Sequence, residues 1–117
     1  MAAVVRVDPE HRTFVLMGEL DMSNSVELDA AIEQADWLDG GSVRFDLSGL
    51  TFVDSCGLQS LLGARAPGRK VVFDRPTSQV RRVLEITGLS ATPGIEIRNA
   101  DGTKEPKLAE VSDSAAM

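Results

Sequence analysis

Strand-like segments alternate with helix-like segments along most of this chain, and that alternation constrains its fold more than any other feature. The segments with a strand pattern are residues 4–7, 13–20, 42–47, 69–74 and 95–98. Only a polar turn at Pro9 separates the first two, whereas a helical pattern precedes each of the others. Strands joined through helices by short connections run parallel. The order ββαβαβαβ therefore predicts an α/β fold, a mixed sheet with an N-terminal hairpin and parallel central strands, packed with helices.

The first helical segment, residues 23–38, has its apolar residues on one face. They are Leu28, Ala31, Ile32 and Ala35. Asn24 and Glu27 stand three positions apart near its start, which predicts a capping box. The segment is expected to end at Gly40 and Gly41.

The other two helical segments have clear stop or start signals. One runs from residue 55 to about residue 66 and is stopped by Pro67. The other is capped by Thr77 and has Gly88 just past its end. Between them, the continuous apolar run within residues 69–74 predicts a strand that is covered on both faces.

Length and composition indicate one domain with a single core. The chain has 117 residues, of which 43% are apolar. No apolar run approaches the roughly 20 residues that span a bilayer, and the N-terminus lacks the layout of a signal peptide. A single cysteine cannot form an internal disulfide framework. These features predict a cytoplasmic protein without membrane insertion.

The apolar periodicity lapses near the C-terminus. Residues 1–98 are therefore predicted to form the domain, and the Ser-, Ala- and acid-rich residues 99–117 are expected to be a mobile tail.

Charge is distributed unevenly between the two halves of the chain. Residues 1–57 carry 11 acids and 3 bases, whereas residues 58–117 carry 7 acids and 9 bases. Between Glu19 and Asp39 there are seven acids and no base. Such a surface repels nucleic acid phosphates and attracts a basic protein surface, so direct nucleic acid binding is not expected. An ordinary solvated helix face is the alternative interpretation of this acidic run.

Residues 46–58, with the sequence DLSGLTFVDSCGL, carry the clearest candidate site. They predict a buried strand, a short loop, and then Ser55 at the amino end of a helix, where N–H groups and the helix dipole favour negative charge. A phosphate on Ser55 would be tolerated there. An ordinary N-cap role for Ser55 is the alternative. Asp54 could itself be the N-cap, or could orient the Ser55 hydroxyl toward a nucleotide.

Three separated segments, in the correct order, resemble the STAS domains of bacterial anti-sigma factor antagonists. Residues 18–21 are similar to the family's G-E-L-D, residues 46–58 to its D-S-x-G-L signature, and residues 80–89 to its closing helix, which ends in T-G-L or S-G-L. In that family the serine after the aspartate of the signature is phosphorylated by a partner kinase. The resemblance covers residues 4–98, implies a STAS-like fold and makes Ser55 the phosphoacceptor.

The resemblance also implies a partner-switching function. The unphosphorylated protein would bind an anti-sigma factor that is a serine kinase, and so free a sigma factor for transcription. The kinase would then phosphorylate Ser55 with ATP, which abolishes binding, and a phosphatase would reset the switch. A monomer or weak dimer is expected. The residues implied in partner binding are Asp21, Asp54, Ser55, Cys56 and Gly57.

The chain departs from the family pattern at two places. Position 56 is a cysteine where the family often has a second Ser or Thr, and the helix after it is cut short by Pro67. The identity of the kinase therefore stays open. A thiolate is favoured in the first turn of a helix, so Cys56 could sense redox state, although a small residue packed in a tight turn is the favoured interpretation.

An enzyme fits the sequence poorly. A serine nucleophile needs a nearby base, and the single histidine, His11, is predicted in the hairpin turn. The chain has no G-x-G-x-x-G, no Walker loop and no Cys/His metal spacing, so no catalytic residue, metal or cofactor is expected. A receiver domain with Asp46 as phosphoacceptor is rejected, because Asp8 followed by Pro9 does not supply its Mg²⁺-binding pair of acids.

Two other functions stay open at the level of sequence. One is a STAS scaffold within a larger stress-sensing assembly, where Ser55 would regulate assembly. The other is a small-ligand module, or an accessory part of a transport system.

Overall fold

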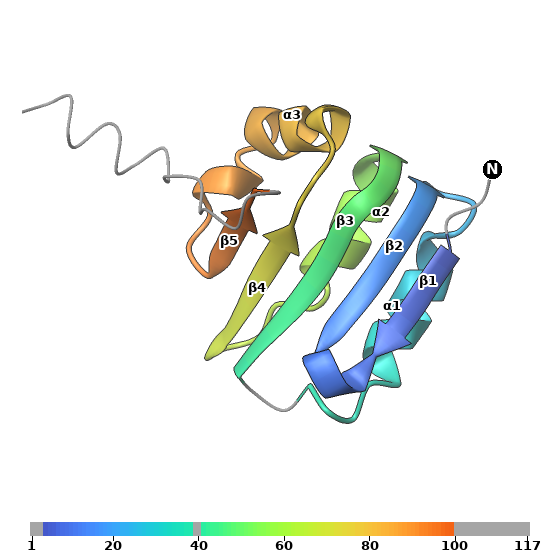
Figure 1. The fold of residues 1–117 in the computed structure, drawn as a ribbon, viewed down its shortest axis with the longest axis vertical. Helices are drawn as coiled ribbons and strands as arrows, with labels where there is room; N and C mark the ends of the chain where they lie inside the picture. Colours follow the sequence, from blue (N-terminus) through green and yellow to red (C-terminus); the bar gives the residue numbers. More distant parts are fainter. Residues whose placement is uncertain (1–3, 39–40, 100–117) are drawn as a thin grey trace, which may run out of the picture.

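One five-stranded sheet, in the order β1-β2-β3-β4-β5, organises the computed structural model, which describes residues 4–38 and 41–99 (Figure 1). The strands are β1 (Val4–Asp8), β2 (Thr13–Leu20), β3 (Gly41–Val53), β4 (Arg69–Asp74) and β5 (Ile95–Arg98). β1 pairs antiparallel with β2, and all further pairs are parallel. The predicted hairpin, mixed sheet and α/β order are confirmed.

The described α-helices lie behind this sheet or beyond its end (Figure 1). They are α1 (Ser25–Glu33), α2 (Ser55–Leu62) and α3 (Ser78–Ile86). In Figure 1, α1 and α2 lie behind the sheet and α3 lies beyond the C-terminal end of β4. The single-turn 3₁₀ helix η1 (Pro9–His11) joins β1 to β2, and a second one, η2 (Leu89–Ala91), joins α3 to β5. Of the helices in the described residues, none has the length and apolar character needed to cross a membrane.

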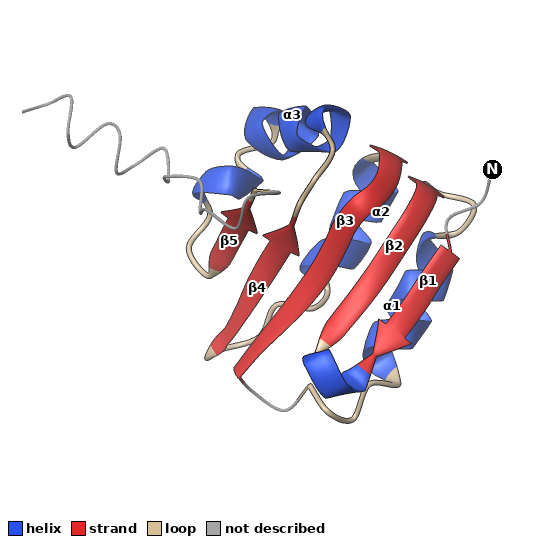
Figure 2. Cartoon of the chain, viewed as in Figure 1, coloured by secondary structure: helices blue, strands red, loops and turns tan. Residues whose placement is uncertain are grey.

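The opposite face of the sheet carries no helix within the described residues (Figure 2). Its strands instead bear charged side chains in ion pairs. Arg75 Nη2 lies 2.6 Å from Asp46 Oδ2, and Lys70 Nζ lies 2.7 Å from Glu96 Oε1. Asp46, considered above as a phosphoacceptor, is thus a strand residue held by an arginine.

The first helix is shorter than predicted, and the predicted capping box is wrong. α1 covers Ser25–Glu33 rather than residues 23–38. Asn24 is the residue before the helix, but its Oδ1 accepts from Asp21 N at 2.9 Å and its Nδ2 donates to Glu19 O at 2.8 Å. The side chain is buried and satisfies the preceding turn, which leaves no contact with the helix N–H groups.

The segment after α1 is fixed by tertiary contacts instead. Arg12 donates through Nη1 to Trp37 O at 2.5 Å and through Nε to Ser42 O at 2.6 Å. Arg69, at the start of β4, donates to Leu38 O. These bonds satisfy the carbonyl groups of Trp37, Leu38 and Ser42, which lie outside any helix. Gly40 and the predicted tail beyond residue 99 lie outside the described residues.

The third strand is longer than predicted, and the second helix is shorter. β3 continues through Gly49 to Val53, so Asp54 alone links it to α2 and the expected loop is absent there. Shifts in the β2–β3 register accommodate the added residues, as β-bulges do. α2 ends at Leu62, with Gly63 as its C-cap, rather than near residue 66.

The third helix is confirmed at both ends. Thr77 Oγ1 accepts from Val80 N at 3.4 Å, and Gly88 follows the C-cap with a φ of 81°. A positive φ favours glycine because it has no Cβ.

Three phenylalanines form the centre of the core. Phe45 of β3 lies between Phe14 of β2 and Phe73 of β4, with ring centroids 5.4 and 5.9 Å apart, and all three are fully buried. Aliphatic side chains from both strands and helices surround them, including Leu16, Leu28, Leu47, Leu61, Val80 and Leu84. β4 is buried on both faces, as the continuous apolar run predicted.

Replacement of the central ring should be costly. We expect Phe45→Ala to lower the free energy of unfolding by about 3–5 kcal/mol, because it removes apolar burial and leaves a cavity. Phe52→Ala, in the same strand but at a side chain that is 48% exposed, should cost less than about 1 kcal/mol. Urea denaturation of the two variants tests this, and similar losses would contradict the described core.

Candidate functional site

The turns after β2 and β3 lie side by side because these strands are parallel and remain paired to their ends. Leu20 pairs with Val53, and Asp54 N donates to Leu20 O at 3.1 Å. The chain therefore leaves both strands at the same edge of the sheet (Figure 1). Asp21 and Asp54 begin the two turns, so these two acids lie at the same edge of the sheet.

The Asp54 carboxylate joins the two turns. Its Oδ1 accepts from Gly57 N at 2.9 Å, and its Oδ2 accepts from Met22 N at 3.0 Å. Asp54 is therefore the N-cap of α2, and Ser55 is its first helical residue. The sequence left open whether Ser55 or Asp54 is the N-cap, and the structure shows that it is Asp54. A single carboxylate thus satisfies one N–H of the helix and one N–H of the neighbouring turn.

Ser55 presents its hydroxyl to solvent at the amino end of α2. The side chain is exposed and makes no hydrogen bond within the described residues. Backbone N–H groups of a first helical turn point outward, and the helix dipole adds positive potential there. A phosphate on this hydroxyl would thus be accessible to a partner and compatible with the helix.

Gly57 is buried, and it shapes the site rather than presenting surface. A Cβ at this position would lie 2.7 Å from Leu20 O and 2.8 Å from Val53 Cγ2. The start of α2 therefore approaches the ends of β2 and β3 more closely than any side chain would permit. Gly57 thus permits the close approach of α2 to the two strands.

Asp21 is oriented by its own turn. Its Oδ1 accepts from Ser23 Oγ at 2.5 Å and from Ser23 N at 3.0 Å. These two hydrogen bonds, that from the side chain first, lower the pKa of Asp21 below its ordinary value, so the carboxylate stays charged near neutral pH.

Cys56 is a free, half-buried thiol in the first turn of α2. It stands one turn before Ser60, whose Oγ donates to Ser25 O at 3.2 Å, so both face α1. This position fits a small residue packed between the two helices.

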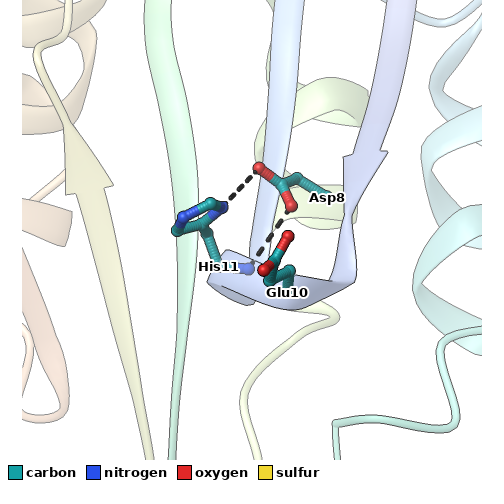
Figure 3. Close-up of side chains that lie close together, drawn as sticks. All are labelled: Asp8, Glu10 and His11. Atoms are coloured by element: carbon teal, nitrogen blue, oxygen red, sulfur yellow. Dashed lines mark hydrogen bonds and ion pairs between the residues drawn. The ribbon is translucent and has the colours of Figure 1, made fainter.

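His11 lies at the other end of β2, in the β1–β2 turn. Its Nδ1 lies 2.9 Å from Asp8 Oδ2, and Asp8 Oδ1 accepts from His11 N at 3.3 Å (Figure 3). Glu10 completes this exposed cluster. These hydrogen bonds stabilise η1, and they hold the single histidine of the chain away from Ser55.

The sequence did not reveal two neighbours of Ser55. Met22 supplies the N–H bound by Asp54, and Phe52 precedes Asp54 by two residues; both side chains are exposed. One feature of the sequence could have indicated Met22: it is an apolar residue within a polar turn, between Asp21 and Ser23.

Comparison with known proteins agrees with this geometry. The model of the family described as "Mlab, STAS domain" matches residues 3–97. An anti-sigma-B factor antagonist of Listeria monocytogenes is 31% identical over 99 residues, which covers 81% of this chain and 85% of that protein. The chain belongs to the STAS-domain anti-sigma factor antagonists.

Solved structures of the same fold extend the match over nearly the whole chain. Unphosphorylated SpoIIAA, an anti-sigma factor antagonist, has a TM-score of 0.55 and 19% identity, with 98% of each chain covered. An antagonist from Mycobacterium paratuberculosis has a TM-score of 0.56 and 24% identity, with 99% of this chain and 94% of that chain covered. These likenesses confirm the STAS fold of the antagonist.

A side chain at Gly57 should separate α2 from the strands. We expect Gly57→Ala to lower the free energy of unfolding by about 1–3 kcal/mol, because a strand carbonyl cannot move aside. The gain in helix propensity, about 1 kcal/mol, should not compensate.

Gly63→Ala is the matched control at the other end of α2. Its nearest contact would be Ser60 O at 3.1 Å, within its own helix, and its φ of −62° suits alanine. We expect little change or a small gain in thermal unfolding measurements. Equal losses for both variants would contradict the close packing assigned to Gly57.

Removal of the Asp54 carboxylate should loosen both turns. We expect Asp54→Ala to cost about 1–2 kcal/mol of unfolding free energy, as the loss of an N-cap does. Asp54→Asn should cost less, because its single oxygen can still accept from Gly57 N or Met22 N. Hydrogen exchange should then show Met22 N less protected in the alanine variant. Unchanged protection would contradict the bridging role.

Proposed function

We propose that the antagonist works as a phosphorylation-controlled binding switch. Its unphosphorylated form binds an anti-sigma factor serine kinase at the edge formed by the β2–α1 and β3–α2 turns, and so frees a sigma factor. Phosphorylation of Ser55 abolishes that binding. The observation that carries the proposal is the exposed, unengaged Ser55 hydroxyl on a helix whose cap is already supplied by Asp54.

The kinase reaction uses ATP held by the partner. Ser55 Oγ bonds to the γ-phosphorus, the bond from that phosphorus to ADP breaks, and the hydroxyl proton passes to a base of the kinase. A phosphatase restores the hydroxyl. Because this chemistry needs ATP and a sigma factor, we place the protein in the cytoplasm, with residues 1–98 as the STAS domain, acting as a monomer or weak dimer without a metal or cofactor.

Charge explains why the complex would separate. A phosphoseryl group adds about −1.5 to −2 charge at pH 7. In the complex that charge must lose water beside Asp54 and near Asp21, whose carboxylate is already ionised. In the free protein, water and the start of α2 stabilise it. The switch therefore acts on binding and leaves folding intact.

Paired substitutions at Ser55 test the proposal against the purified anti-sigma factor serine kinase of the source bacterium. With ATP present, Ser55→Ala should keep its affinity, whereas Ser55→Asp should bind at least tenfold more weakly in calorimetric titration.

Ser78→Asp is the matched control. Ser78 is also an exposed serine at the first position of a helix, behind the N-cap Thr77 of α3. This variant should bind like the original protein. Equal affinity of Ser55→Ala and Ser55→Asp would refute the charge switch and favour a scaffold or small-ligand STAS module.

A further inference from the structure

Three exposed apolar side chains are carried by the segments next to the Ser55 turn. Met22 is 75% exposed, Val26 is 65% exposed and Phe52 is 48% exposed. They belong to the β2–α1 turn, to α1 and to the end of β3. Single exposed apolar residues are ordinary on protein surfaces, but a group of them marks a contact site. In the described residues, the other large exposed apolar side chains, Val7 and Ile86, lie on β1 and α3.

The backbone places each of the three close to the start of α2. Met22 N bonds to the Asp54 carboxylate, and Phe52 precedes Asp54 by two residues. Because Val53 is buried toward the helices, Phe52 faces the opposite side of the sheet. Val26 follows Ser25, whose carbonyl oxygen accepts from α2. The three residues therefore lie on segments that meet near the start of α2, with Phe52 on the helix-free side of the sheet and Met22 and Val26 on the β2–α1 side.

The chain segments that carry these three residues are acidic. These two segments, residues 13–43 and 45–64, contain no lysine or arginine. They do contain the ionised Asp21 beside Met22, and the exposed Glu27 beside Val26. A partner with matching chemistry has an apolar surface bordered by arginine and lysine.

We infer that Met22, Val26 and Phe52 are the apolar contacts by which the anti-sigma factor kinase holds this protein, through an apolar surface with a basic border. The inference rests on the proposed function and specifies its partner surface. It also places the Ser55 hydroxyl within an apolar contact. A phosphate there would lose more water on binding than one at the edge of an interface, which strengthens the effect of phosphorylation.

The test measures binding to the purified kinase in the Ser55→Ala background, so that phosphorylation cannot intervene. Met22→Gln, Val26→Gln and Phe52→Gln should each weaken binding, with a loss of at least tenfold for one or more of them and at least 100-fold for the triple variant. Urea denaturation should show unchanged folding, because all three side chains are exposed.

Ile86→Gln is the matched control, since Ile86 is an equally exposed apolar residue, 77% accessible, on α3. It should bind normally. For the charged border, Glu27→Gln should slow association at low salt, whereas Glu85→Gln on α3 should not.

The outcomes separate the two claims. If Ser55→Ala binds the kinase but the Gln variants bind equally well, the apolar contact is refuted and the proposed function stands. If Ser55→Ala itself does not bind the kinase, both the proposed function and the apolar contact are refuted. If Ile86→Gln weakens binding as much as Met22→Gln does, the contact surface lies elsewhere and the inference is overturned.

Discussion

The parallel pairing of β2 with β3 up to Leu20 and Val53 is the constraint on which the site depends. It releases two turns at one edge of the sheet, one from each strand. Asp54 then bonds to both, through Gly57 N and Met22 N. Without that pairing, Asp54 would cap its helix and nothing more. With it, the start of α2 and the β2–α1 turn become one surface around Ser55.

The two ends of the sheet are built differently. Around Ser55, the β2–α1 turn and the end of β3 carry exposed apolar and acidic side chains. At the other end, arginines serve structure: Arg69 donates to Ala64 O at 2.7 Å beyond α2, and Arg12 binds the carbonyl groups of Trp37 and Ser42. These arginine side chains donate hydrogen bonds to backbone carbonyl groups that have no partner within a helix. The acids near Ser55 match the basic border that we propose for the partner.

Local signals in the sequence predicted the parts that local physics determines. β2, β4 and β5 were predicted to the residue, because apolar runs bounded by turn residues mark their limits. The boundaries of α3 followed from Thr77 and Gly88, whose capping roles depend on adjacent residues only.

Tertiary contacts determine what the sequence mispredicted. Asn24 has the residue type and spacing of a helix cap, yet its side chain serves the preceding turn. The Ser48-Gly49 pair resembles a turn, yet β3 passes through it because pairing with β2 continues. At the site, the motif identified Ser55 and Asp54. The hydrogen bond from Met22 N and the exposure of Phe52 could not be predicted in the same way. They depend on how β2 and β3 align, and the apolar periodicity of the sequence does not give that alignment.

The central claim is that phosphorylation controls binding without disturbing the fold. The most direct test prepares the protein phosphorylated on Ser55 and measures, on that one sample, its free energy of unfolding and its affinity for the anti-sigma factor kinase. We expect the unfolding free energy to stay within about 1 kcal/mol of the unmodified value, because the helix N-terminus accommodates the charge, and the affinity to fall at least tenfold. A large loss of stability, or an unchanged affinity, would contradict the claim.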